Sequence, residues 1–428
     1  MKIIQAEDFY NELANADTTD EDDTALDEAV LEIIRTVRTK KDAALFDYTE
    51  RFDGAKLNGL TVSQEEFIEA EKKTSKEFLD ALYKAANNIR NFHTKQLEKS
   101  WIVPEENGIL LGQMTTPIEK VGVYVPGGKA GYPSTVLMAV IPAQIAGVDE
   151  IVITTPPGKD GKVNPYVLLA AKMLGIDKIY KIGGAQAIAA LAYGTETVEK
   201  VEKIVGPGNA YVARAKKWVY GTVGIDMIAG PSEICIIADE HANPRYVAAD
   251  LLSQAEHDET AKAICITTSN ELAEKIRQEV NVQAEKLERK EIVAASIASN
   301  GRIILAKDSD EACKIANRIA PEHLEVMTAQ PLELLPKIKH AGAIFLGSHS
   351  PEPLGDYFAG PNHTLPTDGT ARFASGLGVH DFMKKSTIIH YSKEALQQAS
   401  GKIIALAEAE GLTAHAKAIQ IRKDDSDA

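Results

Sequence analysis

Short apolar runs alternate with helical patterns along most of the chain, from about residue 121 to residue 346. A short apolar run bounded by turn residues indicates a buried strand, and apolar positions repeating every three or four residues indicate a helix that covers it. The alternation predicts a parallel sheet with helices on both faces. The first series predicts strands at 121–125, 151–154, 178–182, 203–205 and 224–227, and helices at 134–146, 164–174, 185–193 and 209–219.

A second series of the same kind begins at residue 234. The stretch 230–258 joins the two series, because it contains a polar turn followed by the first strand and helix of the second. The expected fold class is therefore α/β, with two units. The second series predicts strands at 234–238, 263–267, 302–305, 324–328 and 343–346, and helices at 244–256, 270–287 and 310–319.

The two ends of the chain follow other patterns. Residues 1–22 are acidic and predict an arm or a loosely packed helix, and two amphipathic helices follow them. Beyond residue 347, about thirty residues rich in Gly, Pro and His show no periodicity, and a loop of that length is usually functional. The tail 379–428 predicts a strand at 386–391 and a helix at 393–409. Because this tail has so few apolar residues for a core of its own, it must pack on the rest of the chain or on another subunit.

Composition narrows the class of protein. The 428 residues are 44% hydrophobic and 25% charged, as in ordinary globular proteins, and the length indicates two or three domains. The net charge of −15, without a run of basic residues, argues against nucleic acid and anionic membranes as partners. No apolar run reaches the ~18 residues of a membrane span, and no targeting sequence is recognisable. We expect a soluble, cytoplasmic protein.

Four polar turns containing glycine are candidates for ligand binding, at 126–128, 183–186, 206–209 and 230–233. Ligand-binding loops in open α/β sheets leave the carboxyl ends of strands, and three of these turns precede a helix whose free amides favour a phosphate. None has the GxGxxG spacing of a dinucleotide fingerprint. Spacing alone leaves open whether the turns bind a nucleotide or only reverse the chain.

Imidazole, amide and carboxylate side chains form a second group of candidates. Gln254 and His257 are three apart and project from one helix face, where they form either two ligands or an ordinary solvated helix end. With Asp356 and His415 they would make an N/O ligand set suited to Zn²⁺ and less decisively to Mn²⁺.

A carboxylate and an imidazole are adjacent at Glu322 and His323, at the mouth of a predicted strand. That arrangement suits a general base and its helper. His363 lies in the long loop, as Asp356 does.

Ten motifs identify a family when they are taken in order. They are YVPGG from Tyr124, YPSTVLM from Tyr132, GGAQA from Gly183, GPGN from Gly206, IDMIAGPSE from Ile225, DLLSQAEH from Asp250, PEHL from Pro321, GDY from Gly355, GPNH from Gly360 and LTAH from Leu412. Over nearly its whole length the chain resembles histidinol dehydrogenases. Ten ordered motifs are far more specific than any one of them.

The resemblance implies roles for named residues. The implied zinc ligands, for one ion per subunit, are Gln254, His257, Asp356 and His415. The implied acid/base pair is Glu322 and His323, and the implied NAD contacts are Tyr124, Gln186 and Asn209. The implied substrate contacts are Ser232, Gln254, His257, His323, Asp356, His363, Glu410 and His415.

The resemblance also implies a reaction. L-histidinol is oxidised through the aldehyde to L-histidine, the last step of histidine biosynthesis, with two NAD⁺ reduced in succession at one site. His323 would take the hydroxyl proton, Glu322 would activate water for the second oxidation, and the metal would hold substrate nitrogen atoms. The family implies a homodimer in which the segment carrying Glu410 and His415 crosses to the partner's site.

The expected architecture is two Rossmann-like α/β domains with incomplete parallel sheets, an N-terminal helical arm and a C-terminal dimerisation tail. The expected bounds are 1–22 for the arm, 23–120 with 234–378 for the first domain, which carries the metal and catalytic residues, 121–233 for the NAD-binding domain, and 379–428 for the tail.

Two other interpretations differ in class. A zinc hydrolase would use Glu322 to activate metal-bound water, and it would leave Gln186 and Asn209 without a role. A nucleotide-sensing or metabolite-sensing protein would bind without turnover, and it would be expected to have lost Glu322, His323 or a zinc ligand, all of which are present.

Overall fold

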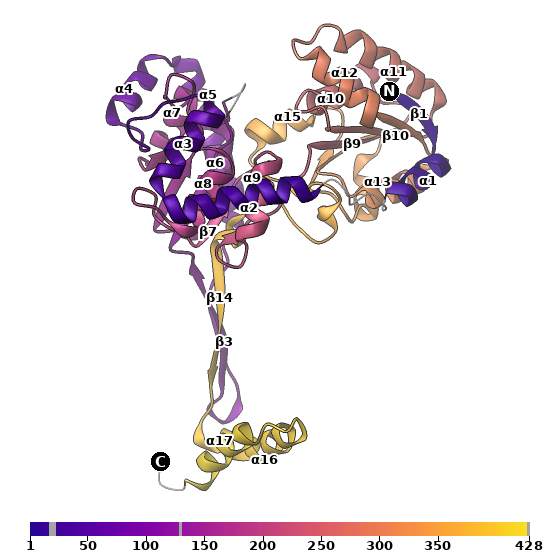
Figure 1. Ribbon diagram of the computed structural model, residues 1–428. Coiled ribbons are helices and arrows are strands. Elements are labelled where there is room, and N and C mark those ends of the chain that lie inside the picture. Colours follow the sequence, from indigo (N-terminus) through magenta and orange to yellow (C-terminus); the bar gives the residue numbers. More distant parts are fainter. Residues whose placement is uncertain (17–22, 128–130, 426–428) are drawn as a thin grey trace. The chain divides into compact units, whose positions relative to one another are not determined.

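The computed structural model describes residues 1–16, 23–127 and 131–425, and Figure 1 labels their helices and strands. The chain divides into two compact units. The main unit comprises Met1–Gln96 and Ile118–Phe382, and the tail unit comprises Leu97–Pro117 and Met383–Ala428. Within the described residues, the main unit holds two parallel sheets and the tail unit holds one antiparallel sheet.

The first series forms a five-stranded parallel sheet, as predicted, and the structure gives the strand order β6-β5-β4-β7-β8. Its apolar strands are buried because helices cover the sheet, and α6 is almost wholly buried despite Pro142 within it. The strands are β4 (Lys120–Tyr124), β5 (Glu150–Thr154), β6 (Ile179–Tyr180), β7 (Lys203–Val205) and β8 (Gly224–Ile225). The helices are α6 (Pro133–Ala146), α7 (Pro165–Met173), α8 (Gly184–Tyr193) and α9 (Ala210–Val219).

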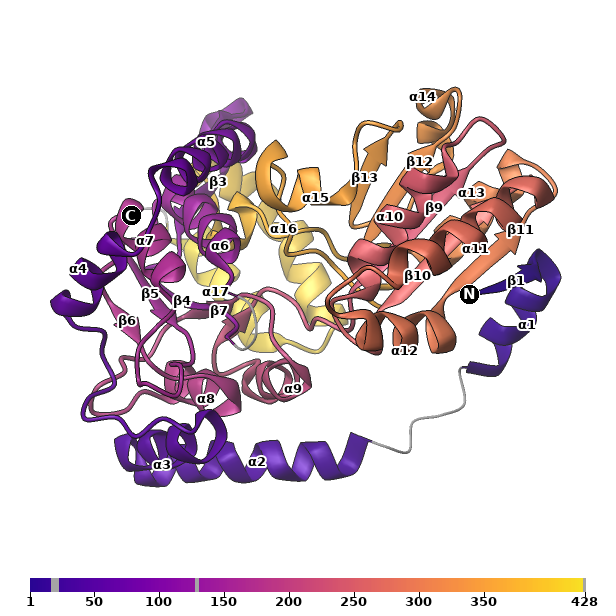
Figure 2. The same ribbon diagram turned by 90° about the horizontal axis from the view of Figure 1, so that it is seen from above.

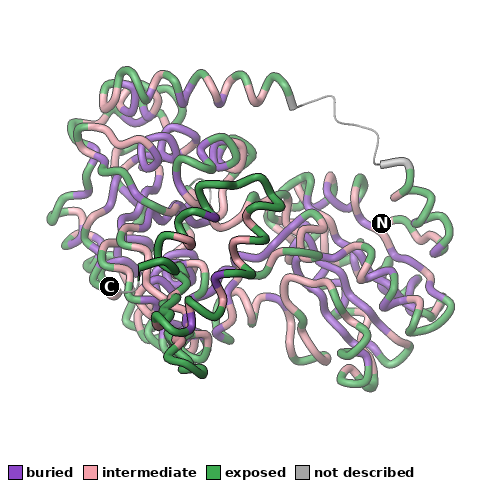
Figure 3. Tube along the Cα trace, turned by 90° about the horizontal axis from the view of Figure 1, so that it is seen from below, coloured by how far each residue is buried: buried purple, intermediate pink, exposed green. Residues whose placement is uncertain are grey.

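The second series forms a six-stranded parallel sheet in the order β1-β11-β10-β9-β12-β13. Figure 3 shows buried residues along its strands and exposed residues along the outer helices. The strands are β1 (Lys2–Gln5), β9 (Glu233–Ala238), β10 (Lys262–Thr267), β11 (Arg302–Leu305), β12 (His323–Met327) and β13 (Ala343–Leu346). The helices are α1 (Ala6–Ala16), α10 (Pro244–Ala255), α11 (Asn270–Ala284), α12 (Lys290–Asn300), α13 (Ser309–Ile319), α14 (Pro331–Leu334) and α15 (Glu352–Leu354). Helix α12 was not predicted.

The N-terminal segment was expected to form an arm or a loosely packed helix over 1–22; the structure has a helix there, α1, but it follows a strand that is part of this sheet. Residues Lys2–Gln5 pair in parallel with Arg302–Leu305 at the sheet edge, as Figure 2 shows, and α1 follows directly. The apolar face of the segment explains the placement, because Phe9 is buried in the core beside β9 and β10. Residues 17–22 lie outside the described residues.

The helices after the N-terminal segment pack on the helices that cover the five-stranded sheet, whereas the sequence had grouped 23–120 with 234–378. Helix α2 contacts α8 and α9, α4 contacts α7, and α5 contacts α6. The apolar stripe of α2 is buried in one core with α8, because that helix presents an apolar face to it. The helices are α2 (Asp23–Lys40), α3 (Asp42–Asp53), α4 (Gln64–Lys72) and α5 (Lys76–His93).

The tail unit is a three-stranded antiparallel sheet, in the order β14-β3-β2, followed by two helices. The predicted strand and first helix of the tail are present, and the second helix was not predicted. Two of the strands come from 97–117, so this stretch belongs with the tail and not with an α/β domain. The elements are β2 (Trp101–Pro104), β3 (Leu110–Pro117), β14 (Met383–His390), α16 (Lys393–Ala409) and α17 (Thr413–Asp424).

One glycine sets how closely the turn after β7 approaches β4. Gly206 has a φ of +114°, and a Cβ on it would overlap the carbonyl oxygen of Tyr124. Gly221 also has a positive φ, +94°, but no described atom lies within 4 Å of its Cβ position.

We expect Gly206→Ala to destabilise the protein by at least ~2 kcal/mol more than Gly221→Ala, because the first adds a clash to backbone strain that costs about 1–3 kcal/mol in both. Urea denaturation of the two variants measures the difference. Equal losses would mean that backbone strain alone explains the glycine at 206.

Candidate functional site

The Glu322–His323 pair lies at the amino end of β12, beside the amino end of β9. Strands β9 and β12 are parallel, with His323 opposite Ile234, so the first residues of both strands meet at one edge of the sheet. The backbone N–H of Glu233 donates to Oε2 of Glu322 at 2.9 Å, and Nδ1 of His323 lies 3.0 Å from the carbonyl oxygen of Glu233. In the neutral ring, Nδ1 therefore carries the proton and Nε2 carries the lone pair that can accept one.

The position of the turn at 230–233 differs from the expectation that ligand-binding turns leave the carboxyl ends of strands. The turn leads into the amino end of β9, whereas the other glycine turns follow the carboxyl ends of β4, β6 and β7. Ser232 is half-buried in this turn, and its carbonyl oxygen accepts a hydrogen bond from the backbone N–H of Lys262 at 3.0 Å. The position of Ser232 next to Glu233 puts it beside the pair.

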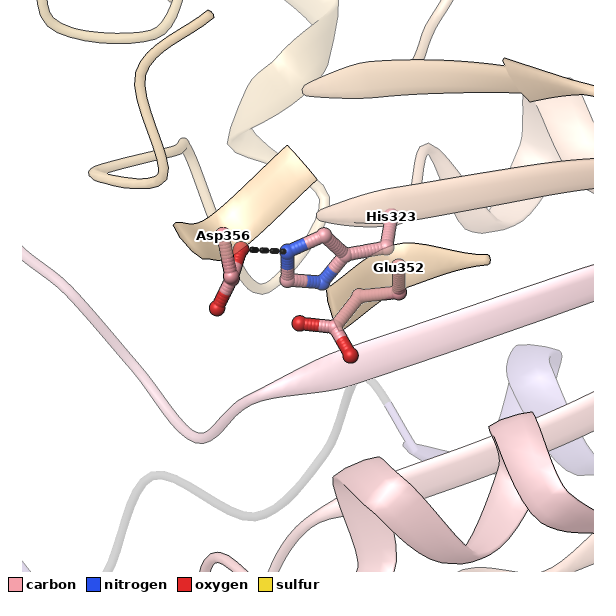
Figure 4. Close-up of side chains that lie close together, drawn as sticks. All are labelled: His323, Glu352 and Asp356. Carbon is pink, nitrogen blue, oxygen red and sulfur yellow. Dashed lines mark ion pairs between the residues drawn. The ribbon is translucent and has the colours of Figure 1, made fainter. Parts of the chain in front are cut away.

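A carboxylate cluster faces the free nitrogen of His323. Nε2 of His323 lies 3.6 Å from Oδ1 of Asp356 and is buried without a hydrogen-bond partner in the described chain. Figure 4 shows the Asp356 carboxylate pointing at the ring, with Glu352 beside it. Ligand atoms of His323, Glu352 and Asp356 lie within 4.8 Å of one another, so this set can hold a metal ion.

Burial and neighbouring charge act in opposite directions on the pKa of each residue of the pair. Burial raises the pKa of Glu322 to about 7, against the effect of the neighbouring imidazole. Burial would lower the pKa of His323, but the carboxylates of Glu322 and Asp356 raise it to about 10. A cation bound at Asp356 would offset these negative charges and favour the neutral imidazole that a base requires.

Helix α10 carries Gln254 and ends at Ala255, so His257 lies in the turn after the helix, which corrects the expectation that both project from one helix face. The helix begins at Asn243, whose side chain caps it by accepting from the N–H of Arg245. Gln254 is 1% exposed, and neither its Oε1 nor its Nε2 has a hydrogen-bond partner in the described chain. His257 is more exposed, yet partial removal of its ring from water lowers its pKa while the Asp356 carboxylate acts to raise it. The charge of Asp356 thus acts on His257, and the role of Gln254 and His257 as ligands stays a prediction.

His363 connects the long loop to α6. Its Nδ1 lies 3.1 Å from the carbonyl oxygen of Asp356, and its Nε2 lies 3.3 Å from Oγ1 of Thr135. The neighbouring Asn362 is buried, and its Nδ2 donates to the carbonyl oxygen of Met138 at 2.6 Å. The loop was predicted without secondary structure, but Glu352–Leu354 and Gly355–Ala359 form short helical turns that carry Glu352 and Asp356.

Glu410 and His415 belong to the tail unit. Glu410 caps the end of α16, His415 lies in the first turn of α17, and both are exposed. Their membership of the site stays a prediction.

Buried carboxylates behind the cluster were missed by sequence reasoning. Glu325 accepts from the backbone N–H of Glu352 at 2.8 Å, and Ser253 donates to Oε2 of Glu352 at 3.1 Å. Burial, together with neighbouring carboxylates, raises the pKa of Glu325 to about 9 and that of Glu352 to about 8. An acidic residue inside an apolar strand was the one local signal for Glu325, and Glu352 in the loop had none.

The three predicted nucleotide contacts line one cavity of about 910 Å³ at the carboxyl ends of β4, β5, β6 and β7. Tyr124 accepts from the backbone N–H of Gly184 at 3.1 Å, and Asn209 caps α9 by accepting from the N–H of Val212 at 3.1 Å. Gln186 is 1% exposed, and its Oε1 has no hydrogen-bond partner in the described chain. An open α/β sheet binds nucleotides at this edge, where its strand order reverses, here between β4 and β7.

A buried ion pair fixes one wall of this cavity. Lys216 pairs with Asp226, and its Nζ also donates to the carbonyl oxygen of Gly206 at 3.0 Å. Asp226 in turn accepts from the N–H of Gly206 at 2.8 Å. The N–H and the carbonyl oxygen of Gly206 are thus both bound by charged side chains, which keeps the turn before Asn209 in one conformation.

Asp53, at the end of α3, also lines the cavity and was not predicted. Its Oδ2 is buried and has no hydrogen-bond partner among the described residues, and burial raises the pKa of Asp53 to about 6. No local motif distinguishes this residue from the other acidic residues of the N-terminal helices.

Comparisons with known proteins agree with the motifs. The family model for histidinol dehydrogenase matches residues 16–423. The chain is 58% identical to a histidinol dehydrogenase of Oceanobacillus iheyensis over 403 residues, 94% of each chain. It is 55% identical to one of Clostridium acetobutylicum over 390 residues, 91% of this chain and 90% of that one. A solved histidinol dehydrogenase structure from Elizabethkingia anophelis matches with a TM-score of 0.90 at 41% identity, covering 96% of this chain and 94% of that chain.

The unpartnered Asp53 predicts a pH-dependent stability. Because its folded pKa of about 6 lies above the ordinary aspartate pKa of 3.8, its stabilising contribution is present below pH 3.8 and is lost as the pH rises through about 6. Asp53→Asn cannot ionise, so we expect it to be more stable than the original protein at pH 7.5 by about 1 kcal/mol, after allowance for solvent screening. Thermal melts at pH 7.5 and pH 5 test this; a gain that did not shrink at pH 5 would contradict it.

Proposed function

The chain belongs to the histidinol dehydrogenase family, and we propose that it oxidises L-histidinol through the aldehyde to L-histidine, reducing two NAD⁺ in succession at one site. Its activity is that of an NAD-dependent oxidoreductase of histidine biosynthesis. One observation carries the proposed chemistry. A buried imidazole, oriented by a backbone carbonyl through Nδ1, keeps its Nε2 without a hydrogen-bond partner in the described chain and has a carboxylate beside it.

In this proposal His323 is the base of the first oxidation. Hydride can leave the alcohol carbon for NAD⁺ only as the hydroxyl proton is removed, and Nε2 of His323 is available to take it. The contact of Nδ1 with the Glu233 carbonyl holds the ring in the tautomer that this step needs.

Glu322 serves the second oxidation. The aldehyde must first add water, because the hydrated form carries the hydrogen that leaves as hydride. A carboxylate with a pKa near 7 is suited to take a proton from that water at neutral pH. Burial of both side chains of the pair supports the proposal, since an enclosed site would keep the aldehyde from escaping between the two steps.

Gln254, His257 and Asp356, with His415 from the tail unit, are the proposed ligands of one zinc ion per subunit. The two unpartnered amide atoms of the buried Gln254 support this set, because a buried amide without partners is costly unless a ligand satisfies it. The alternative set His323, Glu352 and Asp356 would occupy the nitrogen that the base needs. A metal ion here would hold the substrate's nitrogen atoms and orient its reacting carbon.

The other proposed contacts follow from the two sites. Tyr124, Gln186 and Asn209 contact NAD in the cavity, and their joint presence in its wall supports this. Ser232 and His363 contact the substrate together with the metal ligands, His323 and Glu410. Residues 234–378 carry the proposed catalytic residues, and 121–233 carry the NAD contacts.

The tail unit is the proposed dimer interface, through which Glu410 and His415 complete the site of the partner subunit. Support comes from the large apolar side chains that the tail unit exposes, since such surface is normally covered in an assembly. They are Trp101, Ile102, Val103, Ile389, Leu406 and Ile421. We also propose a cytoplasmic location, which the three buried free cysteines support. Among the described residues, no helix is long and apolar enough to cross a membrane.

The proposed reaction predicts how many NADH form per histidinol. Purified protein given limiting L-histidinol and excess NAD⁺ should form two NADH per histidinol, followed by absorbance, and a chelator should abolish the reaction until Zn²⁺ is restored. A zinc hydrolase would turn over its substrate without NAD⁺, and a sensing protein would bind without turnover. One NADH per histidinol would exclude the second oxidation.

The second prediction separates the two ligand sets. We expect His323→Ala to lower kcat by roughly 10²–10⁴-fold while zinc content stays at one ion per subunit, because the variant removes the base and leaves the ligands. Gln254→Ala should lose most of its zinc. Metal analysis of both purified variants measures this. Loss of zinc from His323→Ala would instead favour the set containing Glu352.

A further inference from the structure

The cavity lacks an acidic residue in the usual place. Nucleotide-binding α/β domains place an acidic residue at the end of the second strand, where it binds the adenosine ribose. In the five-stranded sheet this strand is β5, and the residues that follow it in the cavity wall are Thr155, Pro156 and Pro157. None of these three can accept a hydrogen bond as a carboxylate.

A carboxylate reaches the same wall from another element. Asp53 ends α3 and lines the cavity with Pro156 and Pro157. It also lies near the hydroxyl of Tyr124, whose pKa burial raises to about 12 with a further contribution from the Asp53 carboxylate. The acid thus comes from a helix that precedes the sheet in sequence.

The local structure gives Asp53 no structural task. A helix C-terminus carries negative partial charge, so a carboxylate there is unfavourable, and Gly54, at a φ of +67°, ends the helix in its place. Oδ2 of Asp53 is buried with no hydrogen-bond partner among the described residues. With a pKa of about 6 the group is ionised at neutral pH. A buried, ionised acceptor of this kind indicates a donor that only a ligand supplies.

Each of the other carboxylates of the wall has a cationic or backbone partner among the described residues, which Asp53 lacks. Glu66 pairs with Lys181 through Oε1, Glu69 pairs with Lys162, and Asp160 accepts from the backbone N–H of Lys162. Two further buried acceptors of the same cavity, Oε1 of Gln186 and Oε2 of Glu66, have no hydrogen-bond partner in the described chain. Three unsatisfied acceptors in one cavity point to a ligand rich in donors.

We propose that Asp53 accepts hydrogen bonds from the two hydroxyls of the adenosine ribose of NAD⁺, and that its charge excludes the 2′-phosphate of NADP⁺. The proposal rests on the proposed function for the cofactor that fills the cavity. A ribose diol offers two donors to one carboxylate, whereas a 2′-phosphate would replace one donor by negative charge beside another. Lysines also line the wall, Lys73 and Lys159 among them, and a phosphate bound by these lysines is the competing arrangement.

The test compares Asp53→Asn with Asp47→Asn in the full-length protein. Asp47 is an exposed acid on the same helix and is not in the cavity wall, so its variant makes the same charge change outside the site. Affinities for NAD⁺ and NADP⁺ are measured by calorimetry, and KM and kcat by NADH or NADPH formation from L-histidinol.

Asp53→Asn should raise the Kd and KM for NAD⁺ roughly tenfold, the difference between a charged and a neutral acceptor, while kcat at saturation and the KM for histidinol change little. The preference for NAD⁺ over NADP⁺, as the ratio of kcat/KM, should fall by at least about tenfold. Asp47→Asn should match the original protein in every measurement.

Other outcomes overturn the proposal. An unchanged NAD⁺ affinity in Asp53→Asn, or an original protein that binds NADP⁺ as well as NAD⁺, would assign the ribose to another residue. Calorimetry keeps this separate from the proposed reaction. If NAD⁺ binding weakened in Asp53→Asn but the original protein formed no NADH from histidinol, the reaction would be wrong and the ribose contact would stand.

Discussion

The backbone of Glu233 holds the reactive pair together. Its N–H donates to Glu322 and its carbonyl oxygen orients His323, while its own buried carboxylate pairs with Lys262 and accepts from the backbone N–H of Asp368. Burying a carboxylate and an imidazole is costly unless hydrogen bonds compensate for the lost water. The parallel pairing of β9 with β12 supplies those bonds, so the candidate site exists only when the six-stranded sheet is formed.

The two sheets of the main unit place their candidate functional residues at opposite ends of their strands. The six-stranded sheet presents its reactive residues at the amino ends of strands, and the five-stranded sheet presents its cavity at the carboxyl ends. The long loop connects them, because Asn362 donates to α6 at Met138 and His363 contacts Thr135 of the same helix. The proposed hydride transfer needs both parts, since the cavity would bind the nucleotide and His323 would remove the proton.

Some of the buried polar atoms without hydrogen-bond partners in the described chain lie where ligands are proposed. Gln254 and His323 carry such atoms beside the carboxylate cluster, and Gln186 and Asp53 carry them in the nucleotide cavity. Folded proteins rarely leave buried polar groups without partners, because such groups lower stability. These positions therefore indicate groups that a ligand would satisfy. The Lys216–Asp226 pair has the opposite role, because it satisfies its own charges and fixes the turn at Gly206.

The sequence by itself determined the alternation of strands and helices and the adjacency of Glu322 and His323, because each is a property of residues close together in the chain. The helix that was expected to carry both Gln254 and His257 ends at Ala255, so their shared helix face was wrong. The ten motifs, taken in order, also identified the family. Tertiary structure alone decided that β1 completes the six-stranded sheet and that α2 packs on α8, since an apolar stripe predicts a buried face without naming its partner. It alone brought Glu352 to His323, and Asp53 into a cavity with residues more than a hundred positions away, because a lone carboxylate has no local pattern to mark it.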